Sequence, residues 1–365
     1  MNKNEYIEWI EEIKEKLPAF LSEMKSENKK GFFRYSYSGD YLNEKFNWGL
    51  GNSVFALKIY RSLNLKPENL NDIICFVQNF QKQNGEFYDP YIKHFSFPLR
   101  TYNALKERDI NRLYHKFVRR AETRQSISAL KLFDIKPKYE FSDFPHTEND
   151  IKKYIDNLNW DIPWGAGSHF SALMFFLSLS EISNKIKLID FLSKYIEKLR
   201  RPDGCWYTGT PSLQLKINGA MKIITGLKAA AEFADINNGK VIFTQVEKLI
   251  DTALLAANDI NACSNFNITY VLRYANELTG GNYRYEEIEN FIKQRLDIYR
   301  EFYHKKYGAF SFYKNKTNTK YYGAYITKGK KEPDIHGTVM FLWGLAVIGS
   351  FWNLNEQTEL YEFVT

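Results

Sequence analysis

Hydrophobic positions follow two helical patterns that alternate along the chain. In segments such as 185–200, which contains Ile186, Ile189 and Ile196, apolar residues recur with helical spacing, which predicts an amphipathic helix with one buried face. In segments such as 169–182 and 218–236, apolar residues occupy most sides, which predicts fully buried helices. The chain is therefore predicted to be all-α, built from pairs of one buried and one amphipathic helix.

Strand patterns are weak, and only Phe310–Tyr313 and Tyr321–Ile326 are predicted to form a small hairpin. The apolar stretch 337–354 is about the minimum length for a membrane span. Three glycines interrupt it, and the related stretch 218–231 carries two lysines. We therefore predict that it is a buried helix of a globular protein.

Three motifs recur along the chain at offsets of 116 to 119 residues. The pairs are Trp48-Gly49-Leu50-Gly51 with Trp164-Gly165-Ala166-Gly167, Asn84-Gly85-Glu86-Phe87 with Asp203-Gly204-Cys205-Trp206, and Asn218-Gly219 with His336-Gly337. Repetition of this kind predicts a ring of about six helical hairpins, with buried helices inside and amphipathic helices outside. We expect residues 1–44 to form an N-terminal helix and a lead-in segment, and 45–365 to form the ring as a single domain.

The turn motifs carry a resemblance to a known superfamily. Gln81–Phe87 and Arg201–Trp206 resemble the Gln-to-Trp repeat turn of the α/α-toroid superfamily of terpenoid cyclases and protein prenyltransferases. The resemblance covers about residues 45–350 and implies an α/α toroid with a central funnel lined by aromatic residues. It also implies that the funnel binds an isoprenoid or another apolar substrate.

Two branches of this superfamily place different chemistry at Pro333–Thr338. Class II cyclases carry Asp-x-Asp-Asp-Thr and protonate the substrate with the middle aspartate, where this sequence has His336 between Asp334 and Thr338. Histidine is a weaker acid than olefin protonation needs. Prenyltransferases bind zinc through Asp, Cys and His, and the resemblance implies Cys263 and His336 as ligands. Asn261 stands at the position of the aspartate, so the cofactor is either zinc or none.

The catalytic candidates are His336, Asp334 and His169. His336 aligns with Asn218, so a shared capping role is the alternative to proton transfer or metal ligation. Asp334 fits two roles, orienting His336 or capping the following helix. His169 lies at the start of a buried helix, where a purely structural role is the alternative.

The substrate-binding candidates lie near the predicted N-terminal ends of the inner helices. Arg124 stands in an otherwise apolar stretch, so its charge is expected to be paired or to contact an anionic ligand. The tryptophans either pack in the core or stack on a sugar or a carbocation. The full set is Trp48, Asn52, Arg124, Gln125, Trp160, Trp164 and Asn218.

Composition narrows the class of function. Lys and Arg number 50 against 43 Asp and Glu, and this excess is too evenly spread to predict nucleic-acid binding. Aromatic residues make up 16%, which fits a large core, a large ligand site, or both. The three cysteines are far apart and the N-terminus lacks a signal-peptide pattern, so we expect a cytoplasmic protein.

Several functions stay open at this point. Phosphate loops, dinucleotide fingerprints, HExxH and GxSxG motifs and DDxxD carboxylates do not occur in the sequence. The leading interpretation is a cyclase-like or prenyltransferase-like toroid, whose status as an enzyme is open. The alternatives are a carbohydrate-active toroid (lyase, epimerase or hydrolase) that binds a sugar, and a non-catalytic toroid binding module. Each of these interpretations is compatible with contact with a membrane surface. The sequence does not identify a partner subunit.

Overall fold

The computed structural model describes residues 1–107, 113, 116–256 and 259–365. It is 57% helix and 6% strand, which confirms the all-α class. Contacts within the chain divide it into two compact units. Unit 1 comprises 1–141, 260–263 and 296–363, and unit 2 comprises 142–259, 264–295 and 364–365. Residues 1–44 belong to unit 1, and the predicted extent of the ring domain, 45–365, stays a prediction.

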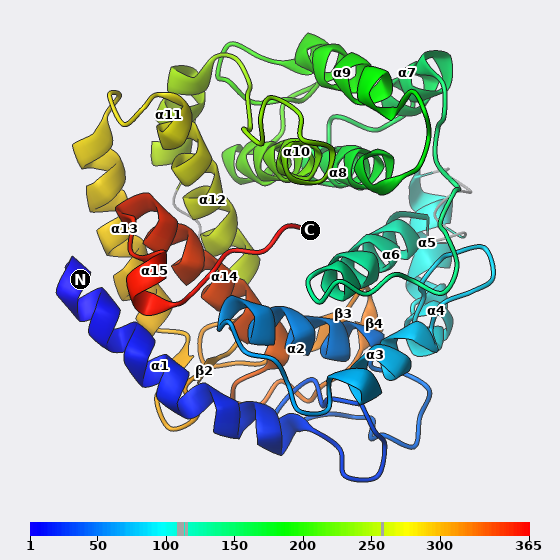
Figure 1. The fold of residues 1–365 in the computed structure, drawn as a ribbon, viewed down its shortest axis with the longest axis vertical. Helices are drawn as coiled ribbons and strands as arrows, with labels where there is room; N and C mark the ends of the chain where they lie inside the picture. The colour runs from blue at the N-terminus through cyan, green and yellow to red at the C-terminus, as the bar shows by residue number, and fades with distance from the viewer. Residues whose placement is uncertain (108–112, 114–115, 257–258) are drawn as a thin grey trace. The chain divides into compact units, whose positions relative to one another are not determined.

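Unit 1 is organised around two buried helices. Helix α14 (Ile335–Trp352) packs against α2 (Leu50–Ser62), and α2 also contacts α3 and α6 (Figure 1). Within the described residues, α14 is the one helix long and apolar enough to cross a membrane, and 83% of it is buried in the protein. The remaining helices are α1 (Lys3–Met24), α3 (Leu70–Gln78), α4 (Pro90–Phe95), α5 (Phe97–Glu107), α6 (Lys116–Lys131) and α15 (Asn355–Thr358).

Two short hairpins occur in unit 1, and the hairpin predicted from the sequence is wrong. Strand β1 (Tyr303–His304) pairs with β2 (Ala309–Phe310), and β3 (Lys320–Tyr321) pairs with β4 (Ala324–Tyr325). Each strand therefore pairs with its neighbour in the chain. Gly308 and Gly323 have φ of +62° and +89°, which lets the chain reverse within a few residues.

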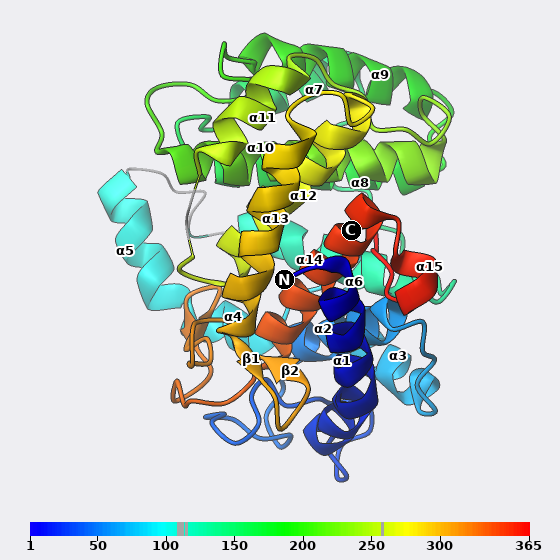
Figure 2. The same cartoon turned by 90° about the vertical axis from the view of Figure 1, so that its left-hand side faces the viewer.

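Unit 2 contains a pair of buried helices, α8 (Pro163–Leu179) and α10 (Leu213–Ala234), that pack side by side. Helices α9 (Lys185–Ile196) and α7 (Glu148–Asp156) lie on one side of this pair and bury one face each (Figures 1 and 2). This arrangement matches the predicted alternation of buried and amphipathic helices. The other elements are α11 (Val246–Leu254), a 3₁₀ turn, Glu197–Leu199, and the greater part of α12 (Ala262–Leu278) and of α13 (Tyr285–Arg300). Closure of the helical pairs into a ring stays a prediction.

Four turns share a glycine with positive φ and, two residues later, a fully buried aromatic side chain. At Gly204 a Cβ atom would lie 2.5 Å from the Leu249 nitrogen in α11, so only glycine allows this close approach. The predicted equivalence of the Gly85 and Gly204 turns is therefore confirmed, and the Gly31 turn is a further copy that the sequence analysis missed. The pairs are Gly31 with Phe33, Gly85 with Phe87, Gly204 with Trp206, and Gly308 with Phe310.

Substituting Gly204 with alanine is expected to lower the free energy of unfolding by about 2–3 kcal/mol, because a left-handed conformation and a steric overlap add together. Gly239→Ala is the matched control, since Gly239 also has positive φ but its Cβ would meet nothing within 4 Å. That variant is expected to lose only about 1 kcal/mol. Equal losses in urea denaturation of the two variants would contradict the role assigned to the close approach.

Candidate functional site

His336 lies among aromatic rings in unit 1, in the first turn of α14. Its ring stacks on Phe55 at a centroid distance of 4.7 Å and lies 4.6 Å from Phe312 and 5.9 Å from Tyr321. The Tyr35 hydroxyl is 3.1 Å from His336 Nδ1. We call these five residues the His336 cluster. The four partners are at most 9% exposed, whereas His336 is partly exposed.

Asp334 fixes the start of α14 and thereby the position of His336. One carboxylate oxygen accepts from the Gly337 N–H at 2.7 Å, and the other accepts from the Phe312 N–H at 2.8 Å and the Asn318 N–H at 3.3 Å. The same bonds hold the segment that carries Phe312. Of the two predicted roles of Asp334, the structure shows helix capping, and Tyr35 is the residue hydrogen-bonded to His336 Nδ1.

Tyr35 is held in place by a carboxylate and by the start of α14. Asp40 accepts from the backbone N–H groups of Tyr35 and Ser36, both at 2.8 Å. The Tyr35 carbonyl oxygen accepts from the Ile335 N–H at 2.9 Å. Burial raises the pKa of Tyr35 well above its usual range, and the nearby charge of Asp334 adds to this shift. Tyr35 is therefore a neutral phenol at physiological pH.

Tyr322 occupies a strained position beside the His336 cluster. It forms the tip of the β3–β4 hairpin with φ of +46°, a conformation that costs a bulky residue on the order of 1–3 kcal/mol. Its ring packs on Tyr321 at 4.4 Å. A glycine or asparagine would relieve the strain, so the aromatic side chain of Tyr322 stands here at a cost in backbone energy.

A buried acidic pair lies close to this hairpin. Glu122 in α6 is 2% exposed and accepts from the Asp89 N–H at 3.0 Å through Oε2, while no donor among the described residues contacts Oε1. Asp89 accepts from four backbone N–H groups, including those of Gly49 and Leu50 at the start of α2. Burial raises the pKa of Glu122 strongly, and the charge of Asp89 raises it further. Glu122 therefore favours its neutral form, and the negative charge of its ionised form would raise the pKa of Tyr322.

Arg124 lies in the same region of unit 1. It is 2% exposed, and its charge opposes the rise that burial causes in the pKa of Tyr322. Gln125, the next residue, accepts a hydrogen bond from Lys58 of α2. Arg124 therefore lies near the His336 cluster, whereas Gln125 links α6 to α2.

Three predicted substrate-binding residues have structural contacts. Trp48 is buried between Phe32 and Tyr91, and its Nε1–H donates to the Asn43 carbonyl oxygen at 3.0 Å. The Asn52 amide donates to the Phe33 carbonyl oxygen at 2.9 Å. Trp160 is 4% exposed and donates to the Ile155 carbonyl oxygen at 3.0 Å. Core packing, the alternative weighed for the tryptophans, describes both Trp48 and Trp160.

The repeated Trp-Gly motif takes different structures in its two copies. Trp48 precedes α2, whose N-cap Gly49 has φ of +98°, whereas Trp164 lies inside the first turn of α8. Trp164 is 38% exposed and Trp48 is 2% exposed. The expected equivalence of these copies is wrong, because Pro163 starts α8 one residue before the tryptophan.

Two further candidates lie in unit 2. The Nδ1 atom of His169 in α8 is 2.9 Å from the Tyr154 hydroxyl, so this histidine is also paired with a phenol. The Asn218 side-chain oxygen accepts from Gln214 at 2.8 Å and from Asn267 at 2.7 Å, which links α10 to α12. Asn218 is therefore a buried link between helices in the sequence slot that His336 occupies in the other repeat.

The zinc site stays a prediction. Cys263 is partly exposed and close enough to Tyr35 for its charge to affect the pKa of that phenol. Over the residues that the structure describes, no three His, Cys, Asp or Glu side chains are grouped to hold a metal ion. Cys263 and His336 thus have no third ligand within that part of the chain.

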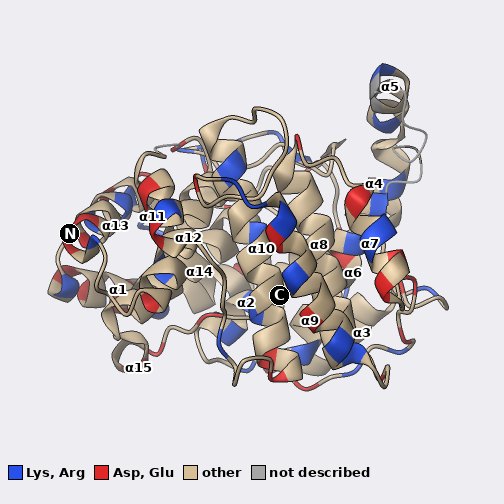
Figure 3. Ribbon diagram, turned by 90° about the horizontal axis from the view of Figure 1, so that it is seen from above, with Lys and Arg blue, Asp and Glu red and all other residues tan. Residues whose placement is uncertain are grey.

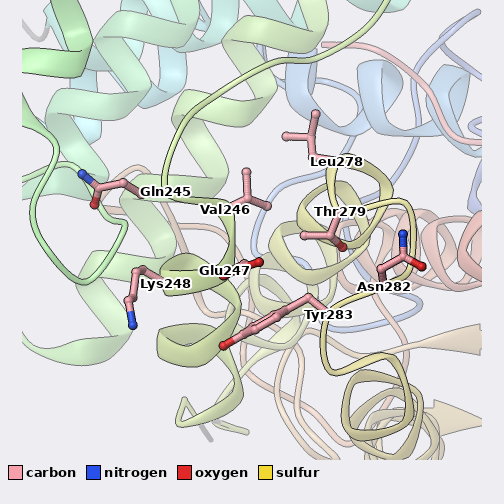
Figure 4. Close-up of a pocket in the computed structure, with 8 residues that line it drawn as sticks. All are labelled: Gln245, Val246, Glu247, Lys248, Leu278, Thr279, Asn282 and Tyr283. Carbon is pink, nitrogen blue, oxygen red and sulfur yellow. The ribbon is translucent and has the colours of Figure 1, made fainter.

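A separate pocket of about 400 Å³ lies in unit 2, between the start of α11 and the end of α12 (Figure 4). Its lining combines charged, amide, hydroxyl and aliphatic groups, and none of the sequence-predicted site residues contributes to it. The lining residues are Gln245, Val246, Glu247, Lys248, Leu278, Thr279, Asn282 and Tyr283.

Sequence reasoning missed most of the His336 cluster. Tyr35, Phe55, Phe312 and Tyr321 lie in four segments, and Tyr35 is 301 residues from His336. One local signal pointed to this region. Tyr322 directly precedes Gly323 at the tip of the β3–β4 hairpin, where hairpin turns favour small polar residues. In comparisons with known proteins, the sequence matched none of the family models and none of the curated proteins.

Proposed function

We propose that unit 1 binds an isoprenoid or another long apolar ligand at the His336 cluster, with His336 and Tyr35 as a proton-transfer pair. The observation that carries the proposal is the partly exposed His336, whose ring contacts the buried rings of Phe55 and Phe312. The closed ring and the relationship to terpenoid cyclases and prenyltransferases belong to the same proposal. They rest on the sequence resemblance.

The chemistry of the cluster supports an apolar ligand and a proton step. Aromatic rings offer apolar contact and can stabilise developing positive charge through their faces. An imidazole exchanges protons near neutral pH, and a neutral phenol at Nδ1 can relay the proton or fix the tautomer. Asp334 and Asp40 act as positioning residues, because their hydrogen bonds hold the segments that carry His336 and Tyr35.

A sugar acid is the second candidate ligand, favoured by the buried Arg124 beside Tyr322. A guanidinium can bind a carboxylate in two-point geometry, and an aromatic ring can stack on a sugar. Thermal stabilisation by uronic acid oligosaccharides, lost in Arg124→Lys, would favour this candidate over the apolar ligand. A non-catalytic binding module would bind a ligand and release no product.

The direct test is titration of the purified protein with farnesyl and geranylgeranyl diphosphates and with the corresponding alcohols, followed by calorimetry. We expect binding that weakens about tenfold or more in both Phe55→Leu and His336→Gln. His304→Gln is the matched control, since His304 lies in β1 of the same unit and outside the cluster. The proposal fails if no ligand binds at millimolar concentration, or if all three variants bind like the wild type.

A further inference from the structure

Helices α4 and α5 present an unusual run of exposed apolar side chains. Within eleven residues, five large apolar side chains are 44% to 76% exposed. Leu99, Tyr102 and Leu105 are spaced to share one face of α5. We call this set the α4–α5 patch: Phe95, Phe97, Leu99, Tyr102 and Leu105. Single exposed apolar residues are normal in proteins, but a contiguous group marks an interaction surface.

Basic residues predominate in the same segment. From Pro90 to Glu107 the sequence contains Lys93, Arg100 and Lys106 against one acidic residue, Glu107. Lys93 and Lys106 are exposed, and the Arg100 guanidinium lies over the Phe97 ring at 5.2 Å. Apolar and basic side chains together are the composition of helices that lie in the interface of an anionic bilayer.

The position of α5 leaves the patch accessible. Figures 2 and 3 show α5 standing apart from the other helices of unit 1, with Lys and Arg along it. At its base, the α4–α5 segment contacts the β3–β4 hairpin. A Cβ at Gly323 would lie 2.8 Å from Leu99, and the Tyr91 hydroxyl donates to the Tyr325 carbonyl oxygen at 2.7 Å. Tyr325 is itself 58% exposed and adds to the apolar surface.

We propose that the α4–α5 patch binds the surface of an anionic lipid bilayer. The apolar side chains would enter the boundary between headgroups and acyl chains, and the two exposed lysines would contact lipid phosphates. A second copy of this chain fits less well, because the basic charges of two apposed patches would repel each other. The α4–α5 patch contacts the β3–β4 hairpin, which carries Tyr321 of the His336 cluster. Contact with a bilayer would therefore place this hairpin next to apolar ligands dissolved in the lipid.

The experiment is sedimentation of the full chain with vesicles of phosphatidylcholine alone or mixed with phosphatidylserine. We expect binding to the mixed vesicles that is reduced by high salt and lowered about tenfold or more in the double variant Tyr102→Glu, Leu105→Glu. Ile186→Glu with Ile242→Glu is the matched control, since both residues are about half exposed in unit 2. Circular dichroism would show that all variants are folded.

Two results would overturn the proposal. One is absence of binding to the mixed vesicles, or binding that the patch variant leaves unchanged. The other is self-association of the wild type in light scattering, abolished by the patch variant, without vesicle binding, which would assign the patch to a second copy. His336→Gln is expected to bind vesicles normally, so failure of ligand binding at the His336 cluster and failure of vesicle binding are distinguishable.

Discussion

Trp206→Ala is expected to lower the free energy of unfolding by about 3–5 kcal/mol, the largest loss from a single substitution that we predict. Trp206 is fully buried, and its Nε1–H donates to Glu197 at 3.1 Å. The Arg200 guanidinium lies 3.4 Å from its ring centroid, and burial lowers the pKa of this arginine. Removal of the indole leaves a cavity and takes a partner from both charged groups.

Urea denaturation followed by circular dichroism measures this loss, with Trp164→Ala as the control. Trp164 is 38% exposed at the start of α8, so its removal is expected to cost less than about 1 kcal/mol. Equal losses in the two variants would show that the Gly-aromatic turn does not stabilise unit 2 in the way described.

Glu122→Gln is expected to change how stability depends on pH. The folded-state pKa of Glu122 is raised by burial and by Asp89, so the folded protein binds a proton that the unfolded chain releases above its ordinary pKa. The contribution of Glu122 is fully present below that pKa and is lost as pH rises toward the raised folded-state value. The loss amounts to at most about 1.4 kcal/mol per pH unit. Glutamine does not titrate, so the variant gains stability relative to wild type as pH rises above the ordinary pKa of a glutamate.

The measurement is the free energy of unfolding of both proteins at several pH values. Glu8→Gln is the control, because Glu8 is exposed on α1 and its replacement should leave the pH dependence of the wild type unchanged. A difference between Glu122→Gln and wild type that stays constant with pH would mean that Glu122 is ionised in the folded protein. The assignment of a neutral acid beside Tyr322 would then be wrong.

Local patterns in the sequence predicted the helices well. A helix with one buried face has apolar residues at helical spacing, and a fully buried helix has apolar residues on most sides. Gly85 and Gly204 were identified as repeat turns because a positive φ and a close backbone contact tolerate only glycine. The grouping of the helices into two units depends on contacts between segments that are distant in the sequence. No local sequence pattern predicts such contacts. For the same reason the hairpin partners of Phe310 and Tyr321 were predicted wrongly.

For the candidate site, His336 and Asp334 were predictable because polar residues at the start of an apolar helix are conspicuous. Phe55 and Phe312 were not, since an aromatic residue facing a site and one facing the core have the same pattern in sequence. The same ambiguity explains why Trp48 and Trp160 were included among the candidates although both are buried in the core. Glu122 lies two residues from Arg124 but is surrounded by charged and polar residues in the sequence, so no local pattern marked it as buried.

Photolabelling would show whether the His336 cluster binds an apolar ligand. A farnesyl analogue with a diazirine group would be irradiated with the protein, and the labelled peptides would be identified by mass spectrometry. We predict labels in segments 51–57, 310–323 and 334–340 that unlabelled farnesyl alcohol displaces. Labels confined to other segments, or labels that the competitor does not displace, would contradict the claim.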